Sequence, residues 1–152
     1  MRLAEALQMR ADLQRRISQL NSRLMVNARV QEGEEPAEDP NQLLAEQEDC
    51  YDELETLMAR INLTNSLTLL PEGSLTELLA KRDRMTQQLN ILRSFLDAAS
   101  SLTSRSTRSE IRILSAVDVR SLQKDCDRRS AELRVLETAI QAANWTTDLL
   151  EN

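Results

Sequence analysis

Histidine is absent from this 152-residue sequence, so the commonest general base and metal ligand is missing. The Glu-x-x-His motif of di-iron helical bundles cannot form without it. Two glycines are too few for a glycine-rich phosphate-binding loop. The cysteines, Cys50 and Cys126, lie far apart and cannot supply the four closely spaced ligands of a zinc site. We therefore expect no enzymatic activity, no metal and no cofactor.

Prolines, which interrupt helices and strands, and aromatic residues are also scarce. The chain has three prolines and three aromatic residues, which is too few for the turns of a β-sandwich or an α/β sheet. A composition rich in Leu, Ala, Glu, Gln and Arg is typical of helical bundles. No apolar run approaches the length that spans a membrane. The charged residues 1–5 run straight into the first helix, without the apolar h-region of a signal peptide. We therefore expect a cytoplasmic protein without membrane contact, in which both cysteines are small buried hydrophobes.

Four segments repeat apolar residues at alternating spacings of three and four, which is the heptad pattern of helices that pack side by side. The expected helices cover residues 2–30, 40–62, 75–100 and 119–144. We call the repeated positions the seams. Their order along the chain predicts an all-α fold, an antiparallel bundle of four long helices in a single domain over residues 1–152.

An alternative arrangement is a pair of elongated hairpins that complete their core by dimerising. Apolar residues beside the seams widen the helix faces and favour a homo-oligomer: Leu7, Leu44, Ile91, Phe95 and Val135. Residues 66–70 and 110–117 alternate at period two and suggest a small antiparallel β-ribbon. Gly33 is expected to end the first helix, and Asp39 and Asp118 to cap the second and fourth.

Charge is distributed unevenly over the first two helices. Residues 1–30 carry six arginines against two acids, whereas residues 31–59 carry eleven acids and no base. Opposite charges indicate that these segments lie against each other, which sets their pairing more than their stability. The acidic loop lacks the pattern of a calcium-binding loop, so we interpret it as a solvated turn.

The seams contain four polar residues where apolar ones are expected: Arg10, Gln47, Arg82 and Arg129. A buried guanidinium without a carboxylate is costly, so these arginines should pair with acids across the bundle or reach water. Our main interpretation is a polar layer that fixes which helix faces which. The alternative is an anion or ligand site inside the bundle.

Two further features could contact a partner. Arg105, Arg108 and Arg112 form the one compact basic cluster outside the expected helices and could touch phosphates. The negative net charge and the lack of neighbouring aromatic residues argue against nucleic-acid binding. Trp145, the sole tryptophan, is expected either to cover one end of the bundle or to anchor a subunit interface.

Several stretches, in order from end to end, resemble a family of small bacterial helical proteins of unknown function, some labelled septicolysin-like. They are residues 3–7 (LAEAL), 10–14 (RADLQ), 30–36 (VQEGEEP), 108–111 (RSEI), 117–119 (VDV) and 144–149 (NWTTDL). The resemblance implies no established reaction, cofactor or catalytic residue. The label itself implies membrane damage.

Three functions follow as hypotheses. The first is a non-enzymatic helical module that self-associates through apolar helix faces. The second is a module that binds an anionic ligand or nucleic acid through the seam arginines and residues 105–112. The third, least favoured, is a membrane-active toxin component.

Overall fold

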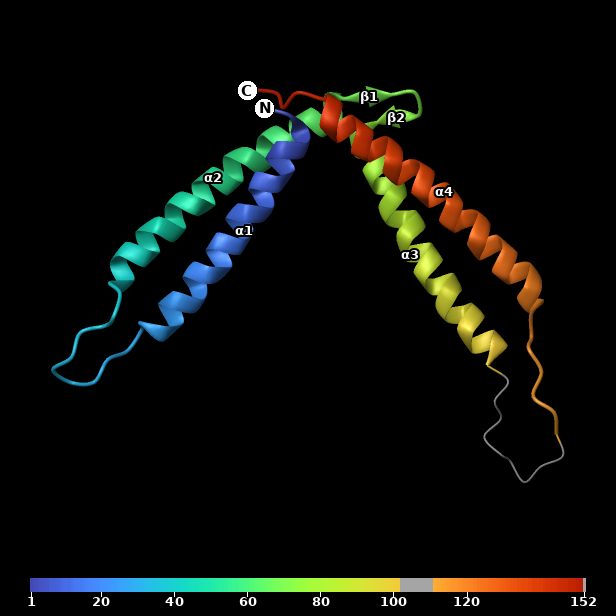
Figure 1. Cartoon of the computed structure of the whole chain (residues 1–152), viewed down its shortest axis with the longest axis horizontal. Helices are drawn as coiled ribbons and strands as arrows, with labels where there is room; N and C mark the ends of the chain where they lie inside the picture. The colour runs from blue at the N-terminus through green and yellow to red at the C-terminus, as the bar shows by residue number, and fades with distance from the viewer. Residues whose placement is uncertain (102–110, 152) are drawn as a thin grey trace. The chain divides into compact units, whose positions relative to one another are not determined.

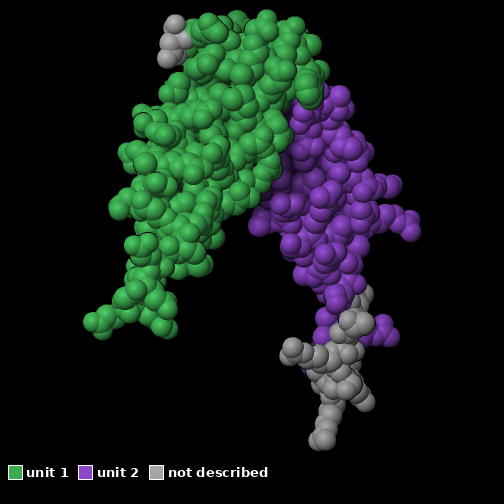
Figure 2. Space-filling model, turned by 60° about the vertical axis from the view of Figure 1, so that its left-hand side comes forward, with its two compact units in different colours: residues 1–75, 142–152 green, residues 76–141 purple. Residues whose placement is uncertain are grey.

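The fold is predominantly α-helical, as the seams predict. The computed structural model describes residues 1–101 and 111–151. Its elements are α1 (Leu3–Val26), α2 (Pro40–Leu67), β1 (Leu69–Leu70), β2 (Gly73–Ser74), α3 (Leu75–Ser100) and α4 (Val119–Thr146), as labelled in Figure 1. The chain forms two compact units, coloured separately in Figure 2: unit 1 is Met1–Leu75 with Ala142–Asn152, and unit 2 is Thr76–Gln141. The single domain over residues 1–152 stays a prediction.

The core of unit 1 lies between α1 and α2. Buried positions recur every seven residues on both helices, so one line of side chains on each helix faces the other. On α1 these include Ala6, Leu13 and Leu20, and on α2 they include Leu43, Cys50, Leu57 and Thr64. The seams of both helices are therefore confirmed, and Cys50 is a small buried hydrophobe.

The first helix is shorter than its seam. It ends at Val26 rather than at residue 30, because Asn27 stops it with side-chain hydrogen bonds. The Asn27 amide donates to the carbonyl of Arg23 at 2.9 Å, and its oxygen accepts from the backbone N–H of Glu38 at 3.0 Å. Gly33, expected to end the helix, instead takes a positive φ of 84° within the following loop.

The second helix begins as predicted and ends later. Asp39 caps it by accepting from the N–H of Asn41 at 2.9 Å, with Pro40 in the first turn. It continues to Leu67 because the seam position Thr64 is fully buried and hydrogen-bonded. The Thr64 hydroxyl donates to the carbonyl of Arg60 at 2.8 Å and accepts from the N–H of Leu150 at 3.0 Å.

The last residues of the chain bind both helices of unit 1. Leu3 donates its backbone N–H to Thr147 at 2.9 Å, and Leu149 donates to Met1 at 2.9 Å. These bonds place the two termini side by side (Figure 1). The hydrogen bond from Leu150 to the Thr64 hydroxyl also joins α2 to this terminal segment, more than eighty residues away in sequence.

The expected ribbon forms with a different partner. The strand β1 pairs antiparallel with β2, Leu69 with Ser74 and Leu70 with Gly73. Residues 111–117, which were expected to pair with residues 66–70, contain no strand. The local pairing closes a two-residue turn, whereas the expected pairing closes a loop of about forty residues at higher entropic cost. Gly73 permits the tight turn with a φ of 141°.

Unit 2 contains most of α3 and α4. Its core cluster is Leu89, Leu96 and Cys126, against which Leu92, Val119, Leu122 and Leu133 pack. Arg93 on α3 donates to the hydroxyl of Ser130 on α4 at 3.1 Å. Asp118 caps α4, as predicted, by accepting from the N–H of Ser121 at 3.1 Å.

Candidate functional site

The two polar seam residues of unit 1 do not lie at the same level. Arg10 and Gln47 belong to unit 1 and are half-buried. Arg16 binds Glu46, which adjoins Gln47, so Gln47 lies near the level of Arg16 on the facing helix. Arg10 precedes Arg16 by six residues, about 9 Å along the helix axis. Unit 1 therefore keeps Arg10 and Gln47 apart.

The seam arginines of unit 2 pair within their own helices. Arg129 Nε donates to Asp125 Oδ2 at 2.9 Å, and Arg82 Nη2 donates to Asp83 at 2.9 Å. Sequence reasoning expected acids on a facing helix or contact with water. The two hydrogen-bonded arginines of α4, Arg129 and Arg128, lower the pKa of Asp125 below its ordinary value.

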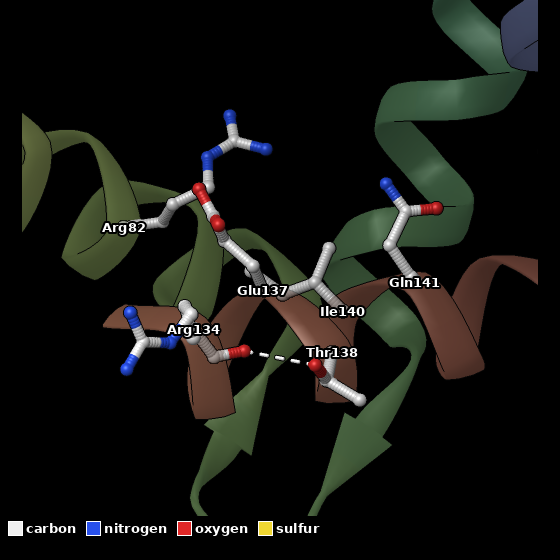
Figure 3. A pocket seen from close by; sticks show the side chains of 6 residues that line it. All are labelled: Arg82, Arg134, Glu137, Thr138, Ile140 and Gln141. Atoms are coloured by element: carbon white, nitrogen blue, oxygen red, sulfur yellow. Dashed lines mark hydrogen bonds between the residues drawn. The ribbon is translucent and has the colours of Figure 1, made fainter. Parts of the chain in front are cut away.

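Arg82 does line a hollow on the surface of unit 2. Figure 3 shows its side chain from α3 together with residues of α4: Arg134, Glu137, Thr138, Ile140 and Gln141. The Thr138 hydroxyl is occupied, because it donates to the carbonyl of Arg134 at 2.9 Å. Two guanidinium groups favour an anion here, whereas Glu137 and the Arg82–Asp83 pair oppose it.

The remaining predicted contact residues differ in whether the structure describes them and in how exposed they are. Arg105 and Arg108 lie outside the described residues, and Arg112 is exposed. Trp145 is 64% exposed. Among the described residues, no group of acids or cysteines is arranged to hold a metal ion.

Exposed apolar side chains form a line along α2. Leu44, Tyr51 and Met58 are spaced by seven residues and are 52%, 50% and 41% exposed. We call these three residues the α2 stripe. Sequence reasoning singled out Leu44 but missed Tyr51 and Met58. Their spacing of seven from Leu44, beside the seam, was the signal that could have found them.

A second apolar surface lies on α3. Ile91 and Phe95 stand one helical turn apart and are 71% and 48% exposed. We call this pair the α3 patch. Both residues were predicted to widen the apolar helix face toward a further neighbour, which stays a prediction.

The charged surroundings of the two surfaces differ. Two acids close to α1 are paired with its arginines: Arg16 binds Glu46 of α2 at 2.7 Å, and Arg23 binds Glu38, in the loop before α2, through both carboxylate oxygens. Hydrogen bonding to Glu46 raises the pKa of Arg16, and hydrogen bonding to Arg23 lowers the pKa of Glu38. These pairs confirm that the basic first helix lies against the acidic second one.

Residues 10–149 match a family model described as a family of unknown function, DUF6847. The chain belongs to this family. A solved structure of a functionally unknown conserved protein from Corynebacterium diphtheriae is 38% identical, with a TM-score of 0.93 over 99% of both chains. No protein with a curated description matches. Within the described residues of this DUF6847 chain, none of the helices has the length and apolar character needed to cross a bilayer.

Proposed function

We propose that the protein is a non-enzymatic interaction module that self-associates through the α3 patch. The observation that carries this proposal is the exposure of Ile91 and Phe95 on a helix segment almost without charge. Exposed neighbouring apolar side chains are typical of a contact surface.

The chemistry of residues 85–96 suits contact with a second copy. In a two-fold interface each patch meets its own counterpart, so a charged patch repels itself. This segment holds one charged residue, Arg93, and its guanidinium is directed to Ser130 on α4. The exposed amides Gln87 and Gln88 can donate and accept hydrogen bonds, so they suit the rim of such an interface.

Light scattering coupled to size exclusion tests the proposal. The wild-type chain should elute with twice the 17.3 kDa mass of one chain. The double variant Ile91→Ser, Phe95→Ser should elute as a monomer with unchanged helical circular dichroism, because both residues are exposed.

Two matched controls separate this surface from others. Val135→Ser removes a side chain that is 72% exposed on α4 and should leave the dimer intact. Trp145→Ser tests the predicted anchor at the end of α4. A monomeric wild type, or a double variant that stays dimeric, contradicts the proposal. If Trp145→Ser alone dissociates the dimer, the interface lies at Trp145 and not at the α3 patch.

The second candidate function is binding of an anionic ligand in the hollow lined by Arg82 and Arg134 (Figure 3). Arginine forks suit phosphate or carboxylate groups. The nearby Glu137 weakens this candidate. Inorganic phosphate that shifts the amide resonances of residues 134–141 in wild type, but not in Arg134→Gln, would favour it.

The cytoplasmic location remains part of the proposal. Cys50 and Cys126 are unbonded and buried, which supports a reducing compartment. The septicolysin-like label implies membrane damage instead. Dye release from anionic liposomes by the purified chain would favour that label over an interaction module.

A further inference from the structure

The α2 stripe has a chemical surrounding unlike that of the α3 patch. Residues 40–59 contain six acids and no base. Glu48 and Glu55 follow Leu44 and Tyr51 by four residues each, so both carboxylates stand one turn along the same side of the helix. Both are exposed. The stripe is therefore apolar with an acidic border.

These bordering acids are not neutralised within the described part of the chain. Glu46, which faces α1, is bound by Arg16 at 2.7 Å. Glu48 and Glu55 make no ion pair among residues 1–101 and 111–151. Arg16 of α1 thus neutralises Glu46, whereas the border of the stripe stays negative.

A second copy of α2 fits this surface poorly. A two-fold antiparallel contact centred on Tyr51 sets Glu48 of one copy close to Glu55 of the other. A parallel contact sets each acid beside itself. Both arrangements place like charges at the edge of an apolar contact, which disfavours association.

We infer that the α2 stripe binds a basic amphipathic helix of another protein. The apolar side of that helix packs on Leu44, Tyr51 and Met58, and its lysines or arginines lie against Glu48 and Glu55. Binding by apolar anchors at heptad spacing, with charges at the border that select the partner, is an established mode of helix recognition. This inference is independent of self-association through the α3 patch.

A designed peptide serves as the probe. It is a fluorescent helix of about three heptads with leucine at a and d and lysine at e and g, and its counterpart has glutamate at e and g. The full chain should bind the lysine peptide at least about tenfold more tightly than the glutamate peptide, measured by fluorescence anisotropy. Added salt should weaken the lysine complex.

Variants locate the binding surface. Leu44→Ser, Tyr51→Ser and Met58→Ser together should weaken binding of the lysine peptide about tenfold or more. Glu48→Gln with Glu55→Gln should weaken it less and reduce its salt dependence. The matched control Ile91→Ser, Phe95→Ser should bind the peptide like wild type, since it alters only the α3 patch.

Three results overturn the inference. The chain could bind both peptides equally, or the triple serine variant could bind the lysine peptide like wild type while keeping its helical circular dichroism. The third is conversion of a dimeric wild type into monomers by the triple variant, which assigns the stripe to contact between copies. If the double variant of the α3 patch stays dimeric while the peptide results hold, self-association through that patch is wrong and this inference stands.

Discussion

Units 1 and 2 both pack two helices through heptad seams, yet they differ in where their ion pairs lie. In unit 1, besides the Arg15–Asp12 pair within α1, Arg16 binds Glu46 on α2 and Arg23 binds Glu38 in the loop before α2. In the described part of unit 2 each ion pair stays on one helix, as in Arg129–Asp125. Ion pairs between helices help to specify which helices face each other, whereas pairs within a helix support only that helix.

The difference extends to the free surfaces. Arg16 neutralises Glu46 on the side of α2 that faces α1, whereas Glu48 and Glu55 border the α2 stripe. The α3 segment of residues 85–96 has one charged residue, Arg93, as the proposed contact with a second copy requires. If both proposed contacts hold, the distribution of charge, more than the amount of exposed apolar surface, decides which partner each helix face accepts.

The largest expected effect tests whether the two cores are equally well packed. Leu20→Ala in unit 1 and Leu89→Ala in unit 2 remove side chains that are 1% and 3% exposed. Each should lower the free energy of unfolding by about 2–5 kcal/mol, because apolar contacts are lost and a cavity remains. Urea unfolding followed by circular dichroism measures both losses.

A control and a contrary outcome complete this test. Leu44→Ala, at a position that is 52% exposed, should cost less than about 1 kcal/mol. A similarly small loss of stability for Leu89→Ala would mean that the core of unit 2 is loosely packed. The two units would then share the heptad spacing of their seams but not the packing of their cores.

An intermediate effect on stability is expected from the hydrogen bond between Thr64 and Leu150, a feature of unit 1. Thr64→Val keeps the shape of a fully buried side chain but removes the hydroxyl that accepts from Leu150. The backbone N–H of Leu150 then loses its partner, which should cost about 1–2 kcal/mol. Thr86→Val is the matched control in unit 2, since that exposed hydroxyl donates only to the carbonyl of Arg82. Equal losses at both positions would show that the terminal segment adds nothing to unit 1.

The smallest expected effect is on thermal stability at low pH. Hydrogen bonds from arginine lower the pKa of Glu38 in unit 1 and of Asp125 in unit 2. In the unfolded chain such carboxyls titrate near pH 4, so their stabilising contribution is complete above about pH 5 and disappears as the pH falls through the lower folded pKa. Melting temperatures should therefore drop less steeply with acid in Glu38→Gln and in Asp125→Asn than in wild type. If the melting temperatures of wild type and both variants fall in parallel as the pH is lowered, these carboxyls do not contribute to the loss of stability in acid.

Much of the local structure could be predicted from the residues. The seams follow from spacing alone, since a helix places residues three and four apart on one face. Asp39 and Asp118 were recognisable caps because a carboxylate at this position accepts from the first N–H groups. The charge contrast between the first two helices foretold the ion pairs of unit 1.

Other features depended on contacts between residues distant in sequence. The role of Asn27 requires the backbone of Glu38, and the burial of Thr64 requires Leu150. The predicted partner of β1 was wrong because the prediction followed the period-two pattern of residues 110–117. The actual partner, Gly73–Ser74, lacks that pattern but follows β1 after two residues, so pairing with it costs less loop-closure entropy.

By itself, the sequence determined four amphipathic helices, the caps Asp39 and Asp118 and an all-α fold, because these depend on neighbours within a few residues. Tertiary structure decided which polar side chains find a partner. It kept Arg10 away from Gln47, paired Arg129 within its own helix, and left the α2 stripe and the α3 patch exposed. Such outcomes depend on the register and side of helix packing, which the spacing of apolar residues does not contain.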